Sequence, residues 1–320
     1  MLTRRQAVTA FSATLASCWL PAFDTTAAPL IYTLKPEKLA DGVWMLPGAQ
    51  EAITAANGGA IANITILDTS AGAVIVDTGP SLRFGEALAA LAKELTGKPV
   101  ARVYLTHFHP DHVLGNQAFA PGVIAATSAV SKGLEAMGEG FADSMYRAAG
   151  DWMRGTEVKL PGAVIEGGVE DFGNRRLRLF AMSGHTESDL VLFDELSGVL
   201  IAGDLVFLDR APTTPHADIA RWRVNLTNLD AMQYARIVPG HGPDEATDRG
   251  IVQTRDWLEA VSAIVTDAFE RGLDISEATA LDLPPWTEKI ALARYEYERT
   301  VMHLYPKLEA EKLPRVDGKS

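Results

Sequence analysis

The chain has 320 residues, of which 47% are hydrophobic and 22% charged, a balance typical of a protein that buries a full-sized core. Its formal net charge of −12 repels phosphate backbones and anionic lipid, so nucleic acid is not expected as a partner. A single cysteine cannot form an intramolecular disulfide, a zinc finger or an iron–sulfur site. Any metal must therefore be held by His, Asp or Glu.

Residues 1–28 have the pattern of an export signal. Arg4 and Arg5 precede a weakly apolar run, as in twin-arginine signals, and this run is too short to span a bilayer permanently. Cys18 completes a stretch that resembles a bacterial lipobox, whereas the small residues at 25–28 suit ordinary signal peptidase. We therefore expect a periplasmic protein, with or without a lipid anchor at Cys18, and no integral membrane span.

The segment from residue 32 to residue 106 is typical of strands joined by tight turns, with one helix among them. Short apolar runs at 43–46, 63–67 and 73–76 predict strands. A helical pattern follows between Pro80 and Gly97, and the run at 100–106 predicts the next strand. This order is a strand–helix–strand unit.

Helices and strands continue to alternate further along the chain. Residues 128–155 have a helical pattern, and the later strands are predicted at 176–182, 190–193, 199–202 and 237–238. Strands interleaved with helices indicate an α/β layer fold. After Gly250 the apolar residues follow helical stripes, which predicts a C-terminal appendage of helices over 251–320.

A dense group of metal-binding side chains follows the strand predicted at 100–106. Residues 107–112 read His-Phe-His-Pro-Asp-His and hold three of the seven histidines. In an extended turn His107 and His109 project to the same side, whereas Asp111 and His112 lie on the next turn and can serve a second position. A set of His and Asp without thiolate fits zinc, with iron or manganese admissible.

Three more polar residues come directly after predicted strands, namely His185, Asp204 and His241. This is where an α/β sheet presents ligands. The order H-x-H-x-D-H, a single His, Gly-Asp and Pro-Gly-His-Gly resembles the metallo-β-lactamase superfamily over about residues 32–245. The resemblance implies a four-layer α/β/β/α sandwich, with a catalytic domain over residues 29–250.

The same resemblance implies a role for each ligand. The first metal would be held by His107, His109 and His185, the second by Asp111, His112 and His241, and Asp204 would bridge the two. Asp77, at the end of a predicted strand, matches the buried aspartate of the family that orients ligands near the site.

Departures from known subfamilies narrow the expected activity. Asp204 stands where some true β-lactamases have a cysteine, and His109 stands where flavo-diiron proteins have a glutamate. Glyoxalase-II-like hydrolases share the aspartate bridge, but no cluster of basic residues is evident in the C-terminal helices. Short stretches such as 57–59 and 114–119 look most like exported zinc hydrolases associated with sulfur-oxidation and quinoprotein-dehydrogenase systems.

Several residues outside these motifs have both a functional and a structural interpretation. His216 lies on a loop beyond Asp204, and it is either a substrate contact or proton donor, or an exposed loop histidine. The segment 141–152 is either a lid over the metals or a cluster packed under a loop. Trp222, Leu226 and Leu229 are predicted to pack in the core rather than to support a cofactor.

We expect a dinuclear zinc-dependent hydrolase in which a hydroxide bridging two Zn²⁺ ions, oriented by Asp111, attacks an ester, thioester or amide-like carbonyl. The substrate is expected to be small and neutral or cationic, because the net charge disfavours anions at long range, although metals could reverse this locally. Two alternatives stay open: a mononuclear iron persulfide dioxygenase, and a non-catalytic metal-binding accessory protein of a quinoprotein or sulfur-oxidising system.

Overall fold

The computed structural model describes residues 30–313. The expected export signal, with Arg4, Arg5 and Cys18, lies outside these residues and stays a prediction. The first sheet has seven strands: β1 (Glu37–Ala40), β2 (Val43–Leu46), β3 (Ile64–Thr69), β4 (Gly72–Val76), β5 (Val100–Tyr104), β6 (Ile124–Ala126) and β7 (Ala163–Val164). The second has five: β8 (Gly168–Asp171), β9 (Arg176–Met182), β10 (Asp189–Asp194), β11 (Val199–Phe207) and β12 (Arg236–His241).

Each sheet combines antiparallel and parallel pairs. Strands β1 to β4 pair antiparallel in chain order, and β4 to β7 pair parallel. In the second sheet β8 to β11 pair antiparallel, and β12 pairs parallel with β11. Parallel neighbours need a crossover. Helix α1 (Leu82–Thr96) provides it between β4 and β5, and α4 (Ile219–Asp230) provides it between β11 and β12.

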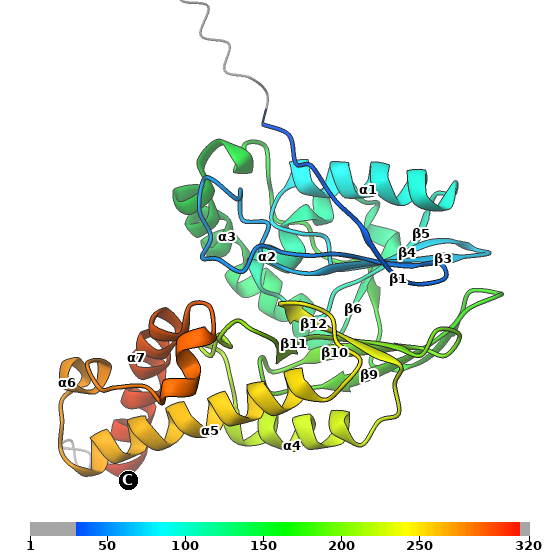
Figure 1. Ribbon diagram of the computed structural model, residues 1–320. Helices are drawn as coiled ribbons and strands as arrows, with labels where there is room; N and C mark the ends of the chain where they lie inside the picture. The colour runs from blue at the N-terminus through cyan, green and yellow to red at the C-terminus, as the bar shows by residue number, and fades with distance from the viewer. Residues whose placement is uncertain (1–29, 314–320) are drawn as a thin grey trace, which may run out of the picture. The chain divides into compact units, whose positions relative to one another are not determined.

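The two sheets lie face to face, with helices on both outer sides (Figure 1). The remaining α-helices of the described residues are α2 (Pro110–Val113), α3 (Ser128–Ala149), α5 (Arg249–Glu270), α6 (Ile275–Thr279) and α7 (Ala293–Lys312). In Figure 1 the cyan helix α1 covers the first sheet, and α4 and α5 cover the second. The predicted four-layer α/β/β/α sandwich with C-terminal helices is therefore confirmed.

Alternation along buried strands explains why the sheets can stack. In β4, Ala73 and Ile75 face the cluster shared with α1, whereas Val74 and Val76 face the cluster between the two sheets. Successive side chains of a strand point to opposite faces, so a strand with an apolar layer on each side reads as an unbroken hydrophobic run. Strand β11 divides its side chains between two clusters in the same way.

Local signals at the predicted ends of α1 also hold. The Ser81 hydroxyl accepts a hydrogen bond from the Phe84 amide at the N-terminus of the helix. Gly97 ends the helix in the left-handed conformation, with φ of 68°. The helix predicted between Pro80 and Gly97 is thus confirmed, with its caps.

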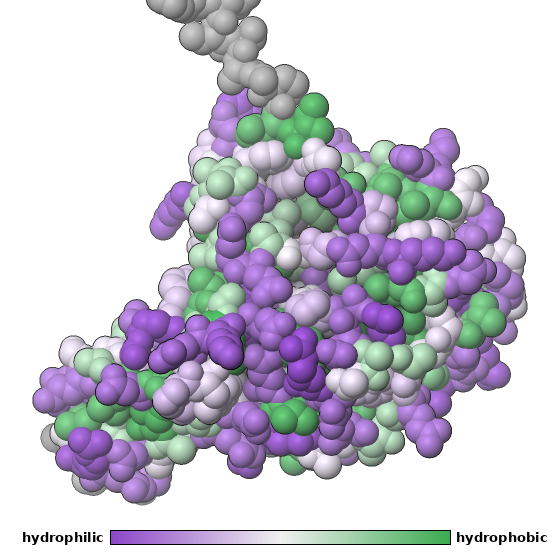
Figure 2. All heavy atoms as spheres, viewed as in Figure 1, coloured by the Kyte–Doolittle hydropathy of each residue, from purple (hydrophilic) through white to green (hydrophobic). Residues whose placement is uncertain are grey.

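The C-terminal helices pack against the second sheet. Trp222, Leu226 and Leu229 of α4 are fully buried, as predicted, in a cluster that includes Trp257 of α5 and Tyr297 of α7. The division into domains at residue 250 stays a prediction. No helix among residues 30–313 is both long and apolar enough to cross a bilayer. The face drawn in Figure 2 is largely hydrophilic, with hydrophobic side chains in smaller patches.

Candidate metal centre

Residues from four strands, or from the turns that follow them, meet at one edge of the sandwich. The turn after β5 supplies His107 and His109, and the turn after β9 supplies His185. Asp204 lies within β11, and His241 is the last residue of β12. Seven histidine and aspartate side chains that the sequence grouped by motif are thereby brought into two neighbouring groups.

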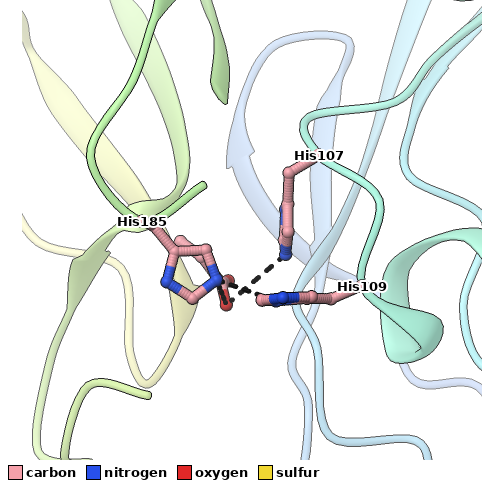
Figure 3. A group of neighbouring side chains, drawn as sticks. His107, His109 and His185 are labelled. Atoms are coloured by element: carbon pink, nitrogen blue, oxygen red, sulfur yellow. Dashed lines mark hydrogen bonds and ion pairs between the residues drawn. The ribbon is translucent and has the colours of Figure 1, made fainter. Parts of the chain in front are cut away.

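The first group contains His107, His109, His185 and Asp204, whose donor atoms all lie within 4.8 Å of one another. Figure 3 shows the rings of His107 and His109 turned toward His185, which lies on a different segment that faces theirs. The Oδ2 atom of Asp204 lies 3.3 Å from His185 Nε2 and 3.7 Å from His107 Nε2. All four side chains are buried. Three imidazoles and a carboxylate thus converge in a largely buried position.

The second group contains Asp111, His112 and His241. Helix α2 begins at Pro110, directly after His109, and this turn places Asp111 and His112 in the second group rather than the first. The Oδ2 atom of Asp111 lies 3.4 Å from His241 Nε2 and 3.7 Å from His112 Nε2.

Asp204 faces both groups. Besides its contacts in the first group, its Oδ1 lies 3.2 Å from His112 Nε2 and its Oδ2 lies 3.4 Å from His241 Nε2. Gly240 makes this close approach of β11 and β12 feasible, because a Cβ at residue 240 would collide with Asp204 Oδ1. The Pro-Gly-His-Gly motif therefore requires a glycine before its histidine for steric reasons.

Asp77 supports the groups from behind. Its φ of 66° turns the chain sharply after β4, and its side chain is buried. Asp77 Oδ1 accepts a hydrogen bond of 2.7 Å from the Thr106 amide, and its Oδ2 lies 2.7 Å from His112 Nδ1. A carboxylate at this position fixes the ring orientation of His112 and leaves Nε2 facing the second group.

Several buried atoms of the two groups have no hydrogen-bond partner. One is His185 Nδ1, and the other three face another member of the set, namely His107 Nε2, His112 Nε2 and Asp204 Oδ1. Unpaired buried polar atoms are rare in folded proteins because losing hydration without a replacement costs free energy. Here the last three belong to the converging set, which is what a site built for cations requires.

The hydrogen bond of His241 identifies the atom that it presents to the site. His241 Nδ1 lies 2.8 Å from the Ile61 carbonyl oxygen. A carbonyl only accepts hydrogen bonds, so Nδ1 carries a proton and the lone pair available to a metal is the one on Nε2. That lone pair faces oxygens of Asp111 and Asp204. Hydrogen-bond acceptors that face one another need a positive ion between them. A set of nitrogen and oxygen ligands without thiolate suits zinc.

The protonation of the rings differs between the groups. Burial lowers the pKa of His107, His109 and His185 well below the ordinary histidine value. They are neutral at pH 7, which is the form that binds metal. Burial alone would also lower the pKa of His112, but neighbouring aspartates, Asp204 above all, raise that pKa well above its usual value.

Comparison with known proteins agrees with this geometry. The family model described as Metallo-beta-lactamase superfamily matches residues 57–241, which is more than half of the chain. The chain belongs to the metallo-beta-lactamase superfamily. Its two His/Asp groups fit a binuclear metal site, and they indicate a metal-dependent hydrolase.

Individual relatives of this superfamily are distant. The chain is similar to the Beta-lactamase-like protein 2 homolog of Caenorhabditis elegans, with 25% identity over 80% of this chain and 81% of that protein. It is 28% identical to the Metallo-beta-lactamase type 2 of Bacillus sp. (strain 170), over 63% of this chain and 75% of that one. A solved Metallo-beta-lactamase from Pontibacter korlensis shares the fold, with a TM-score of 0.56 and 20% identity over 71% of this chain and 99% of its own.

His216 lies beside the first group of this superfamily site. Its Nδ1 atom is 2.8 Å from Nε2 of His109, and its ring is half-buried at the edge of the site. Because Nε2 of His109 faces His216, the ring presents Nδ1 to the first group, 2.9 Å from His185 Nε2. The loop that carries His216 therefore contacts His109, a proposed metal ligand.

A cavity of about 450 Å³ opens over the two groups, and Asp111, Asp204 and His241 reach it. Phe141, Met145 and other residues of α3 line one side. Met145 is also buried against Leu114 and Met153 in a small cluster. The segment 141–152 thus lines the cavity and is packed from behind, and its role as a lid stays a prediction.

Helix α7 lines the opposite side, which the sequence did not predict. The cavity-lining residues of this side are Thr213, Tyr295, Glu296 and Arg299, and we call them the C-terminal wall. The Thr213 hydroxyl donates a hydrogen bond of 2.6 Å to Glu296 Oε2, and Arg299 Nη1 donates one of 2.9 Å to the Thr213 hydroxyl oxygen. The spacing of 295, 296 and 299 places them on one helix face, but no local motif links that face to the metal ligands.

Proposed function

We propose that the protein is a dinuclear zinc hydrolase that acts on an ester, thioester or amide-like carbonyl of a small molecule. The observation that carries this proposal is the pair of buried His/Asp groups, joined by Asp204 and open to one cavity. Two zinc ions bound there would supply a hydroxide nucleophile at neutral pH and a Lewis acid for the carbonyl oxygen.

The residues of the chain divide the remaining tasks. The Asp111 carboxylate belongs to the second group and reaches the cavity, so it can accept a hydrogen bond from the nucleophile and orient it. His216 holds the ring of His109 through their nitrogen–nitrogen contact, and its place on the cavity edge suits proton donation to a leaving group.

A side-chain nucleophile is a weaker interpretation of this cavity. Ser144 lines it, but its hydroxyl donates a hydrogen bond of 2.8 Å to the Gly140 carbonyl within α3, and no described contact joins it to a histidine. An activated serine needs a general base within hydrogen-bond reach. Water activation therefore fits the described residues better.

The second group also distinguishes the proposal from its alternatives. A mononuclear iron persulfide dioxygenase needs a single ion, and it would leave the second group of Asp111, His112 and His241 without a function. An accessory protein that binds metal without turnover would not need the cavity over both groups. Both alternatives become outcomes of the same experiment.

That experiment measures metal content, hydrolysis and oxygen uptake side by side on zinc-loaded and iron-loaded protein, across thioesters, lactones, β-lactams and persulfides. We expect two ions per chain and oxygen-independent hydrolysis by the zinc form. Turnover confined to the iron form, with stoichiometric oxygen uptake, would establish the dioxygenase instead. His303→Ala is the control for metal content, because His303 lies outside both groups and is exposed.

We also propose that the protein is exported to the periplasm and serves a sulfur-oxidation or quinoprotein-dehydrogenase system. Arg4 and Arg5 and the short apolar run after them support the twin-arginine route. Changing both arginines to lysine should retain a precursor in the cytoplasm, whereas unchanged export would indicate the general secretory route. Intact mass of the mature protein, with Cys18→Ala beside it, tests the lipid anchor.

A further inference from the structure

Asn63 is a buried asparagine that binds a turn far away in the sequence. It is 5% exposed and directly precedes β3 of the first sheet. Its Nδ2 atom donates a hydrogen bond of 2.9 Å to the Pro239 carbonyl and one of 2.7 Å to the Gly242 carbonyl. Its backbone amide donates a third, of 2.8 Å, to the Gly240 carbonyl. One residue thus binds three of the four carbonyls in the Pro-Gly-His-Gly motif that contains His241.

The turn around His241 depends on hydrogen bonds of this kind. Glycines flank the histidine on both sides, and Gly242 has a φ of 98°, so the neighbours of His241 have no side chains with which to hold the turn. The His241 carbonyl, the remaining one of the motif, accepts a hydrogen bond of 3.1 Å from the Leu208 amide. Without the Asn63 side chain, two buried carbonyls would lose this partner, and an unpaired buried carbonyl destabilises the arrangement that contains it.

The segment that carries Asn63 also holds the ring of His241. The Ile61 carbonyl, two residues before Asn63, accepts the 2.8 Å hydrogen bond from His241 Nδ1. The bonds of Asn63 fix this segment against the turn, so they also keep the Ile61 carbonyl in place beside the ring. Backbone and ring of the ligand are therefore held together, and His241 Nε2 stays directed at Asp111 and Asp204.

The amide group of Asn63 matches its surroundings atom by atom. Its Oδ1 atom accepts a hydrogen bond of 3.0 Å from the Gly48 amide, whereas Nδ2 faces two carbonyl oxygens. A side-chain amide has two N–H donors and one acceptor oxygen, so both donors are used here. A carboxylate of the same shape would instead turn an oxygen toward the two carbonyl oxygens. Gly48 leads into the loop whose Ala52 and Ile53 line the cavity, so the same amide also joins that loop to the turn.

We propose that Asn63 positions His241, and thereby the second metal ion, by fastening the Pro-Gly-His-Gly turn of the second sheet to the first sheet. This inference rests on the proposed function, because it assigns Asn63 a role in the second metal group. Asn63 is a positioning residue, since it acts through the backbone of the turn. It orients His241 from behind as Asp77 orients His112.

The test is a titration of the metal-free, full-length protein with Co²⁺, followed by visible absorption, because the absorption bands depend on the ligands of each ion. Wild type should bind two ions, and His241→Ala identifies the binding step that belongs to the second group. Asn63→Asp should weaken that step about 10- to 100-fold, as is typical when a residue that orients a metal ligand is lost. The other step should keep its affinity and its bands.

Asn57→Asp is the matched control. Asn57 Nδ2 also donates a hydrogen bond to a backbone carbonyl, that of Ala52 at 2.8 Å, but the described hydrogen bonds of Asn57 stay within residues 51–60. Asn57→Asp should therefore leave both binding steps unchanged. Asn63→Ala, which removes the donors without adding a charge, should weaken the second-group step as Asn63→Asp does. An unchanged second-group step in the Asn63 variants, or equal weakening of both steps, would overturn the inference.

A second measurement decides the inference without any metal. The Ile61 carbonyl holds the proton on His241 Nδ1, so in metal-free wild type this proton should exchange slowly with water in NMR spectra of histidine-labelled protein. Asn63→Asp should speed the exchange at least about tenfold, and equal exchange rates would overturn the inference. If wild type binds only one ion, the dinuclear proposal fails, and the exchange rates alone decide the role of Asn63. Should Asn63→Asp fold poorly, Asn63→Ala replaces it in both measurements.

Discussion

The two sides of the cavity are built in opposite ways. The metal groups come from short motifs at strand ends, and their seven side chains face one another. The C-terminal wall comes from a loop after β11 and from α7, and Thr213 and Glu296, 83 positions apart, are joined by one hydrogen bond. The family model matches residues 57–241, so it includes all seven metal-site residues but ends before α7.

This difference separates chemistry from selectivity. A metal site needs a few donor types at fixed short spacings, which a strand end and the turn after it can supply alone. A substrate wall needs shape and charge assembled from distant segments, and it can change while the reaction stays the same. We therefore expect changes in the metal groups to affect ion binding and rate, and changes in the wall to affect substrate affinity alone.

Loss of the shared carboxylate should have the largest effect. Asp204→Ala should lower the metal content from two ions to one, because the three histidines of the first group remain, and should lower the hydrolytic rate about 1000-fold or more. Elemental analysis and kinetics measure both. Asp244→Ala, which removes an aspartate that follows β12 and lies outside both groups, should keep two ions. Two ions retained by Asp204→Ala would contradict the bridging role.

Asp77→Asn should weaken metal binding without removing a ligand. An amide nitrogen beside His112 Nδ1 favours the ring tautomer with the proton on Nε2, which cannot bind metal. We expect metal affinity to fall about 10- to 100-fold. Competition with a chelator measures it. Asp209→Asn is the matched control, since Asp209 also has a positive φ, of 56°, but contacts Arg249 instead of a metal-site histidine. Equal metal affinity in both variants would show that Asp77 does not support metal binding.

A change in the C-terminal wall should leave the metals in place. Glu296→Gln removes the partner of Arg299, whose side chain is 39% exposed, so the expected loss of stability is only about 1 kcal/mol. We expect KM to rise about fivefold with unchanged metal content. Thermal unfolding, kinetics and elemental analysis measure the three quantities. Glu298→Gln, on an exposed position of α7, should alter none of them. Metal loss in Glu296→Gln would show that the two sides are not independent.

Acidification should separate the two metal groups by the order in which they lose their ions. The pKa of His112 is raised in the metal-free protein, whereas burial lowers the pKa of His107, His109 and His185. A proton and a metal compete for the same lone pair. As the pH falls, His112 is protonated first, so the second group should release its ion at a higher pH than the first. Metal content after dialysis at a series of pH values measures this, and the reverse order would contradict it.

The structural features that could be predicted from the sequence each depend on residues within a short stretch of the chain. The run at 107–112 and the ends of α1 are such stretches, and the predicted fold and the helix between Pro80 and Gly97 are confirmed. The side chains of β4, which point alternately to the two apolar layers, are likewise consecutive in the sequence. The role of α7 could not be predicted, because helical spacing shows that a face exists but not what it faces.

Sequence alone determined which side chains could bind metal, because donor type and spacing near strand ends decide that chemistry before any tertiary contact forms. Tertiary structure decided how each of these atoms is paired, as when the Ile61 carbonyl selects the tautomer of His241. It also joined Thr213 to Glu296, which lie 83 positions apart in the sequence. These pairings depend on contacts between distant segments, so the type of a polar side chain can be read from the sequence but its partner cannot.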